Sequence, residues 1–184
     1  QNWGFPTYNW EEMSKDGFAW WKNRFRKMAE YFDAYRIDHI LGFFRIWEIP
    51  MDAVHGLLGY FNPAMPYSAE ELAAVGFDMS DGNWSTPLTY DWVLWGIFGD
   101  LAEEVKANYL KDGKLLPEYS TQRKVADKLV GDDPKTAAIR EGLMTLLDDV
   151  LFIEDPRQKG HYHPRISGQA TYSYRSLDAY RRSA

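Results

Sequence analysis

The sequence contains no cysteine among its 184 residues. Without thiols, the chain forms no disulfide bond, holds no metal ion through thiolate ligands and has no cysteine nucleophile. The absence of disulfides is compatible with the reducing interior of a cell, and we therefore expect a cytoplasmic protein.

Long apolar runs and an excess of basic residues are also missing. No stretch approaches about 18 uncharged apolar residues, so no transmembrane helix is expected. The chain has 27 acidic and 21 basic side chains, which gives a net charge of −6. Nucleic acids and anionic membranes are bound by clusters of Lys and Arg, so we expect neither as a partner.

The chain does contain enough apolar residues to build a folded core. Hydrophobic residues make up 45% of the sequence and aromatic residues 16%, and the length corresponds to about one domain of roughly 150 residues or slightly more. The chain starts at Gln1 rather than at Met and stops inside a polar stretch, residues 180–184. We therefore expect it to be a piece of a longer protein.

Local signals predict a helical start and then a strand. Asn9 is a helix cap, with Glu12 three residues later as in a capping box. Apolar residues from Phe18 to Phe32 recur at steps of three and four, which predicts an amphipathic helix. Residues 34–40 are rich in aromatic and β-branched side chains and predict a short strand.

The remaining sequence predicts short helices separated by loops. Capping signals occur at Ser68 and at Asp133, where Pro134 follows in the first helical position. Apolar stripes at helical spacing run over residues 93–105 and 139–150, and we expect a second strand near residues 150–153. Residues 159–166 are expected to form a polar loop.

Arg36 and Asp38 are the first candidates for chemistry. Side chains two apart on a strand point to one face, so these two would lie together while Ile37 packs behind them. A guanidinium beside a carboxylate favours the ionised acid, and an ionised carboxylate in a pocket is what a covalent glycosidic nucleophile requires. The alternative is an ordinary ion pair at the end of a strand.

The surrounding residues carry a family resemblance. The opening residues 1–8, a helix containing Trp20-Trp21, the sequence Arg36-Ile37-Asp38-His39 with Gly42-Phe43, and Trp47-Glu48-Ile49-Pro50 resemble the 4-α-glucanotransferase family, also called amylomaltase or disproportionating enzyme. This resemblance is specific over residues 1–50 and weaker over 151–184. Residues 51–150 resemble an insertion found in the longer, plant-cytosolic type of the enzyme.

The resemblance implies a role for each matching residue. Asp38 matches the catalytic nucleophile on the fourth barrel strand, and Arg36 matches the arginine that keeps that carboxylate ionised. His39 matches a residue that hydrogen-bonds sugar hydroxyls, and Gln1 and Trp3 match substrate-contacting residues. Trp47, with Trp3 and Tyr8, is a candidate for the aromatic wall of the site; the alternative for all three is packing in the core.

Two carboxyl groups of the family's site are missing from this sequence. The family's acid/base Glu precedes Asp-Leu-Gly, and its stabilising Asp lies in a His-Asp pair; neither motif is present, and Glu154-Asp155-Pro156 is not a substitute. A retaining mechanism needs two carboxyl groups about 5–5.5 Å apart. We therefore expect this piece to be inactive on its own.

The prediction is accordingly a fold that is mainly α with a few short strands, cut from a (β/α)8 TIM barrel plus a helical insertion. Residues 1–50 would be a barrel segment, 51–150 the insertion and 151–184 a return to the barrel. A full barrel needs roughly 250 residues, so this chain cannot close one.

The predicted function is transfer of α-1,4-glucan segments between a donor and an acceptor glucan or maltooligosaccharide, within the parent barrel. Alternatives are an α-glucan hydrolase of the same superfamily, or a helical interaction module without catalysis. No cofactor or metal is expected. His161 and His163 lie two apart in the predicted loop without a clear third and fourth ligand, and His55 has no catalytic neighbour in sequence.

Overall fold

The structure is a computed structural model that describes residues 2–183, and within that range it is mainly helical with a few short strands. The α-helices are α1 (Trp10–Lys15), α2 (Ala19–Ala29), α3 (Ala69–Ala74), α4 (Asp91–Phe98), α5 (Ala102–Tyr109), α6 (Gln122–Lys128), α7 (Pro134–Asp148), α8 (Tyr172–Arg175) and α9 (Ala179–Ser183). The strands are β1 (Ile46–Glu48), β2 (Tyr60–Asn62), β3 (Tyr67–Ser68), β4 (Leu110–Lys111), β5 (Lys114–Leu115), β6 (Phe152–Glu154) and β7 (His161–Pro164). None of the described helices is long and apolar enough to cross a membrane.

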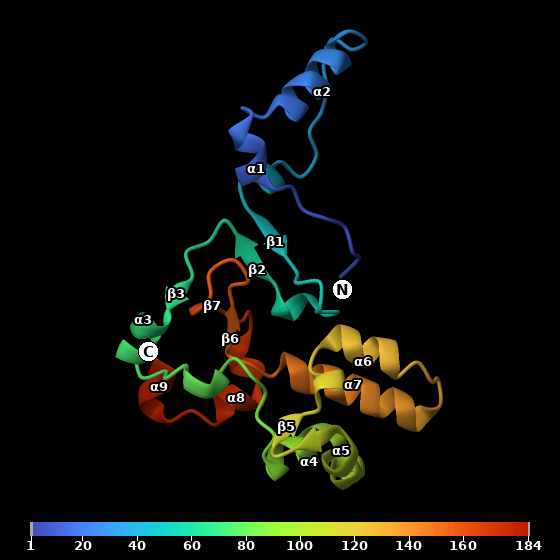
Figure 1. Ribbon diagram of the computed structural model, residues 1–184, viewed down its shortest axis with the longest axis vertical. Coiled ribbons are helices and arrows are strands. Elements are labelled where there is room, and N and C mark those ends of the chain that lie inside the picture. The colour runs from blue at the N-terminus through green and yellow to red at the C-terminus, as the bar shows by residue number, and fades with distance from the viewer. Residues whose placement is uncertain (1, 184) are drawn as a thin grey trace.

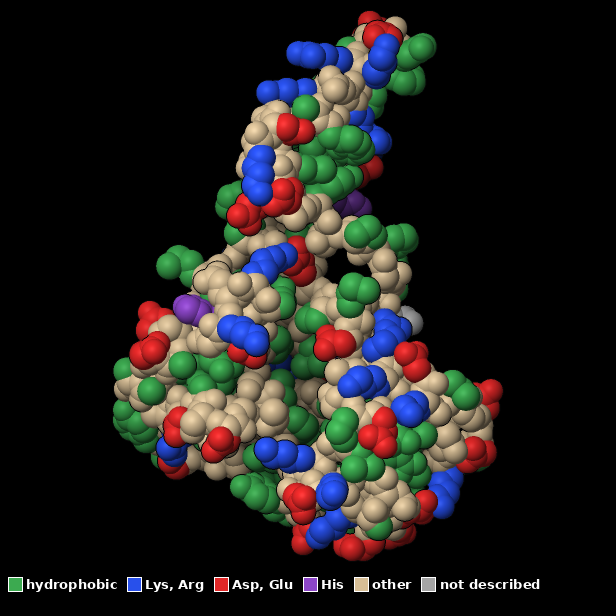
Figure 2. Space-filling view, in the orientation of Figure 1, with side chains coloured by type: hydrophobic (Ala, Val, Ile, Leu, Met, Phe, Trp, Pro, Cys, Tyr) green, Lys and Arg blue, Asp and Glu red, His purple; other side chains and the backbone are tan. Residues whose placement is uncertain are grey.

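The molecule consists of a broad body and a projecting arm (Figure 1). The arm carries α1 and α2, and the body holds the helices from α3 onward and most strands. Figure 2 shows hydrophobic side chains gathered along the arm, where Trp20, Phe32 and Phe44 are 47%, 63% and 77% exposed. The arm therefore leaves much apolar surface uncovered by the described chain.

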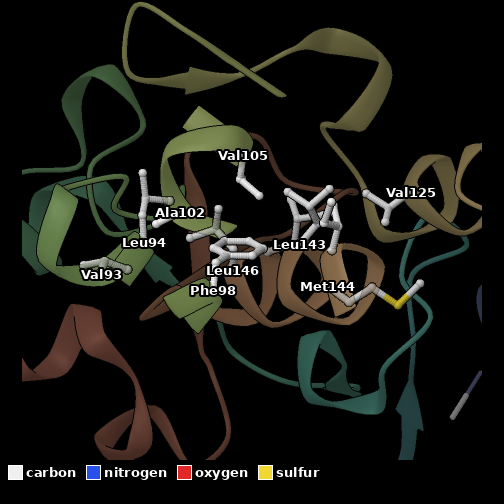
Figure 3. Close-up of a cluster of buried hydrophobic side chains, with 11 residues drawn as sticks. Val93, Leu94, Phe98, Ala102, Val105, Val125, Leu143, Met144 and Leu146 are labelled. Atoms are coloured by element: carbon white, nitrogen blue, oxygen red, sulfur yellow. The ribbon is translucent and has the colours of Figure 1, made fainter. Parts of the chain in front are cut away.

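The main core lies between α4, α5, α6 and α7 (Figure 3). Helix α7 begins where the Asp133 side chain accepts a hydrogen bond from the Thr136 backbone N–H, with Pro134 in the first helical position. Its apolar stripe, predicted from sequence, is buried: Ile139, Leu143 and Leu146 are 4%, 0% and 0% exposed. They pack against a group drawn from the other three helices: Val93, Leu94, Phe98, Ala102, Val105 and Val125.

Three small antiparallel sheets complete the fold. Strand β1 pairs with β2, with Glu48 opposite Tyr60. Strand β7 lies between β3 and β6, and β4 and β5 form a hairpin. A second apolar cluster packs beside the three-stranded sheet, with members from distant parts of the sequence: Leu72, Phe77, Met79, Leu151, Phe152, Tyr162 and Leu177.

Several local predictions are confirmed. The Asn9 side chain accepts a hydrogen bond from the Glu12 N–H at the start of α1, and Ser68 and Glu71 form a reciprocal capping box at α3. The strand expected near residues 150–153 forms at Phe152–Glu154.

Two secondary-structure predictions are wrong. No strand forms over residues 34–40; that segment is irregular and leads into a 3₁₀ helix, Ile40–Phe43. A strand needs a hydrogen-bonded neighbour, and none of the described strands lies beside it. The polar loop expected over 159–166 instead contains β7, because β3 and β6 both pair with it.

Helix α7 packs so closely against α4 that one position allows no side chain. A methyl group at Gly142 would overlap the ring of Phe98, and both residues are buried. We predict that Gly142→Ala lowers the free energy of unfolding by about 1–3 kcal/mol, because overpacking outweighs the helix propensity gained. Urea unfolding measures this change in the free energy of unfolding.

The matched control is Glu141→Ala, at the neighbouring exposed position. It should change stability by less than about 0.5 kcal/mol. A Gly142→Ala protein as stable as the control would contradict the packing described for α4 and α7.

Candidate functional site

The segment around Asp38 borders a hollow of about 390 Å³ in the arm, lined in part by residues of α2. Arg36, Asp38 and His39 all line it. Asp38 is the only carboxylate among its described lining residues. The structure thus brings three of the predicted site residues together around one carboxylate.

Arg36 and Asp38 form the ion pair that the sequence predicts, although no strand holds it. Arg36 Nε lies 2.7 Å from Asp38 Oδ1, and the two side chains are 88% and 63% exposed. An ion pair this exposed adds at most about 1 kcal/mol to stability, so it orients the carboxylate rather than holding the fold. Ile37, expected to pack behind the pair, is 40% exposed.

His39 follows the pair at a sharp change of backbone direction. Its φ is +55°, in the left-handed region that non-glycine residues seldom adopt. It directly precedes the 3₁₀ helix Ile40–Phe43. The turn places His39 on the same hollow as Asp38.

Aromatic rings from the opening loop, from α2 and from the 3₁₀ helix wall the hollow. The Trp21 ring lies 5.2 Å from Tyr8, 5.5 Å from Phe25 and 4.9 Å from Phe43, centroid to centroid. These separations are typical of favourable aromatic contacts. Tyr8, expected as a wall residue or as core, lines this hollow and is 45% exposed.

Trp3 and Trp47 border a second hollow, of about 500 Å³. Trp3 is 74% exposed, whereas the Trp47 indole N–H donates to the Gly56 carbonyl at 3.0 Å and its ring lies 4.9 Å from Phe61. Trp47 is therefore partly a packing residue. Gln1 lies outside the described residues.

Glu48, for which the sequence predicts no role, lies in the wall of the second hollow and is 8% exposed. Its carboxylate accepts hydrogen bonds from Thr7 Oγ1 (2.9 Å), Asn62 Nδ2 (2.9 Å) and Arg157 Nη2 (2.7 Å). Burial raises the pKa of Glu48, but these hydrogen bonds outweigh burial and hold the pKa below its ordinary value. The one feature of the sequence that could have indicated a buried carboxylate here is an acidic residue between two apolar residues, Trp47 and Ile49.

His163 belongs to a buried pair rather than to a surface loop. Its Nε2 lies 2.8 Å from Asp155 Oδ2, both side chains are 7% exposed, and its ring stacks on Tyr60 at 4.4 Å. Burial raises the pKa of Asp155, but hydrogen bonds from His163 and from the Arg157 N–H outweigh it and lower the pKa. No cluster of metal-binding side chains occurs in residues 2–183.

His55 also has a partner that the sequence did not reveal. Its Nδ1 lies 2.5 Å from Asp148 Oδ2. The buried amide of Gln122 joins the same network: its oxygen accepts from the N–H groups of Val54 and His55, and its nitrogen donates to Asp148. This network fixes the backbone after β1 to helices α6 and α7.

Comparison with known proteins gives the chain a family context. Residues 1–164 match the glycoside hydrolase 77 family model, described as 4-alpha-glucanotransferase. A rice protein, 4-alpha-glucanotransferase DPE2 from Oryza sativa subsp. japonica, is 42% identical over 97% of this chain and 20% of its own length.

Bacterial relatives match shorter stretches. The 4-alpha-glucanotransferase of Aquifex aeolicus is 41% identical over 41% of this chain and 19% of its own length. That of Streptococcus pneumoniae is 52% identical over 27% of this chain and 10% of its own. The chain thus spans about a fifth or less of these relatives, and no solved structure matches it.

The hydrogen bonds at Glu48 predict a pH-dependent contribution to stability. Since folding lowers the Glu48 pKa, this contribution is complete at neutral pH and is lost as the pH falls through the folded pKa. Glu48→Gln places an amide against three donors, so we expect a loss of about 1–3 kcal/mol at pH 7. Denaturant unfolding of both proteins at several pH values measures this loss of stability.

The difference between wild type and Glu48→Gln should begin to shrink below about pH 4, where a glutamate in the unfolded chain takes up its proton, and should disappear only below the lowered pKa of the folded protein. Glu11→Gln, at an exposed helical position, is the control and should change little at any pH. A gap that stays constant from pH 7 to pH 3 would show that the charge of Glu48 is not what stabilises the junction.

Proposed function

The chain belongs to the 4-alpha-glucanotransferase family, and from this membership we propose that it supplies the nucleophile-bearing part of an enzyme that transfers α-1,4-glucan segments between glucans or maltooligosaccharides. The observation that carries the proposal is the Arg36–Asp38 ion pair at an aromatic-lined hollow. A carboxylate oriented by a guanidinium beside a surface of aromatic rings fits the first step of a retaining glycosyl transfer.

In the proposed reaction, an Asp38 carboxylate oxygen attacks the anomeric carbon of the donor glucan. The glycosidic bond breaks, and the leaving oxygen takes a proton from an acid that the rest of the parent barrel supplies. The 4-hydroxyl of an acceptor glucan then attacks the same carbon, gives its proton to that group and releases Asp38. Each displacement inverts the anomeric carbon, so the product keeps the original configuration.

The neighbouring residues have supporting roles in this proposal. Arg36 would orient the Asp38 carboxylate through the ion pair at 2.7 Å. His39, on the same hollow, would hydrogen-bond hydroxyl groups of the sugar next to the broken bond. Gln1, Trp3 and Trp47 would contact the glucan further along; the exposed ring of Trp3 is suited to stacking on a sugar.

The isolated chain should not turn over glucans. The described lining of the Asp38 hollow contains no second carboxyl group, and proton transfer to the leaving group is worth about 10²–10⁴-fold in rate. The remainder of the barrel, which would also cover the apolar arm, is therefore the partner that completes the site.

The proposed domain arrangement follows the same logic. Residues 1–50 and 151–184 would belong to a (β/α)8 barrel and residues 51–150 to an insertion. The rice relative, which matches nearly the whole chain, and the bacterial relatives, which match 41% and 27% of it, are consistent with an insertion that only some members carry. A cytoplasmic location, in starch or maltose metabolism, remains part of this proposal.

Transfer rather than hydrolysis requires that water be excluded while an acceptor is held in place. Because the Asp38 side chain is 63% exposed in this chain, that exclusion would need the aromatic walls of the hollow together with the rest of the barrel. Product analysis at high maltooligosaccharide concentration distinguishes the two, because transfer gives longer and shorter oligosaccharides and hydrolysis gives only shorter ones.

We predict that Asp38→Asn in the full-length protein abolishes disproportionation of maltotriose, by at least about 10³-fold, because an amide cannot form the covalent intermediate. The exposed Asp38 side chain contributes little to folding, so the thermal unfolding midpoint should stay within about 2 °C. Chromatography of the oligosaccharides measures the transfer rate, and a melting curve measures the unfolding midpoint.

Asp33→Asn is the matched control, since Asp33 is an exposed acid on the same arm and does not line the hollow. It should keep wild-type transfer. An Asp38→Asn protein that still transfers glucan at a comparable rate would exclude Asp38 as the nucleophile.

A further inference from the structure

Helix α4 carries two exposed tryptophans that the proposed catalytic site does not use. Trp92 is 48% exposed and Trp95 is 68% exposed. Because they are three residues apart, their indoles lie on the same helix face. The opposite face is buried in the core through Val93 (0% exposed) and Leu94 (1%). The helix therefore cannot turn to bury the tryptophans without losing its core contacts.

The two indoles share a hollow of about 350 Å³ with charged side chains. Asp91, Glu103 and Lys106 also line it, and Lys106 Nζ lies 2.5 Å from Asp91 Oδ1. The hollow is thus lined by two carboxylates, one ammonium group and two indole rings. The hollow offers apolar stacking area together with hydrogen-bond donors and acceptors.

The ring of Trp92 is held in place before any ligand binds. It packs against Tyr172, with ring centroids 5.7 Å apart. Tyr172 reaches this position because Gly96 lacks a side chain: a Cβ there would lie 2.6 Å from the tyrosine hydroxyl. The Tyr172 backbone N–H in turn donates to Asp149 Oδ2 at 2.6 Å. A pre-ordered ring loses less conformational entropy on binding.

This combination of groups matches a carbohydrate better than a protein partner. A pyranose ring has an apolar face of C–H groups, which can lie on an indole, and a rim of hydroxyls, which can hydrogen-bond to carboxylate and ammonium groups. The centre of a protein interface is instead depleted of charged side chains. Three charged residues in so small a hollow therefore favour a polyhydroxylated ligand.

We propose that Trp92 and Trp95 form a second glucan-binding surface, which holds an α-1,4-glucan chain away from the Asp38 hollow. The choice of glucan as the ligand rests on the proposed function. Figure 1 places α4 at the opposite end of the molecule from α1 and α2. A glucan bound at α4 adds a second attachment, which raises the affinity for long chains.

The test is binding of soluble amylose to the full-length protein, measured as retardation in native gels that contain the polysaccharide. Asp38→Asn serves as the background, so that the polysaccharide is not consumed. In this background, Trp92→Ala with Trp95→Ala should weaken amylose binding about tenfold or more. Trp92→Phe with Trp95→Phe keeps two aromatic faces and should retain most of the affinity.

Tyr67→Ala is the matched control, because Tyr67 is a 49% exposed aromatic residue outside this hollow; it should bind amylose normally. Unchanged amylose affinity in the double alanine variant would overturn the proposal. So would a wild-type oligomer that dissociates in this variant while amylose affinity stays the same, since the surface would then be a protein interface.

The proposal and the catalytic role of Asp38 can fail separately. If Asp38→Asn still transfers glucan, the nucleophile is wrong; binding is then measured with amylose under conditions that stop turnover, such as low temperature. A loss of amylose binding confined to the Trp92 and Trp95 alanine variant would still support the second surface.

Discussion

The buried carboxylate of Glu48 joins three parts of the chain that lie far apart in sequence. Thr7 comes from the opening loop, Asn62 from β2 and Arg157 from the connection between β6 and β7. A carboxylate buried to this extent is tolerated only because each of these donors points at it. The opening loop carries Trp3, and Trp47 directly precedes Glu48 on β1. This junction therefore sets where the second hollow lies. The position of the aromatic residues thus depends on a charged group that does not itself need to touch a sugar.

Local structure was predictable from the sequence where short-range hydrogen bonds decide it. Asn9, Ser68 and Asp133 each cap a helix as expected, because a cap is formed by residues three positions apart. The buried stripe of α7 was predictable for the same reason, since helical periodicity depends only on neighbouring residues.

The strands and the polar junctions depend on partners distant in sequence, and apart from β6 they were not predicted correctly. Residues 34–40 have strand-forming side chains but no neighbouring strand among the described residues, whereas the polar stretch around His163 becomes a strand because β3 and β6 flank it. The contact between Arg36 and Asp38 was predictable from their spacing. The strand that was expected to hold them does not form, and the ion pair lies in an irregular segment. The Glu48–Arg157 contact spans 109 positions, and no local pattern indicates which arginine would reach that acid.

The two ends of the molecule have different tasks in the proposed function. In these proposals the arm presents the reacting carboxylate, and the helical body is a packed scaffold whose α4 surface holds a long polymer. The large apolar area left on the arm agrees with its being covered by further elements of a complete barrel.

The central functional claim is that Asp38 forms the covalent bond to the sugar. The most direct measurement is to inactivate the full-length protein with a fluorinated maltosyl compound, which slows release of the intermediate, and to locate the attached sugar by peptide mass spectrometry. The account predicts a single maltosyl adduct on the Asp38 carboxylate. An adduct on any other residue would contradict it.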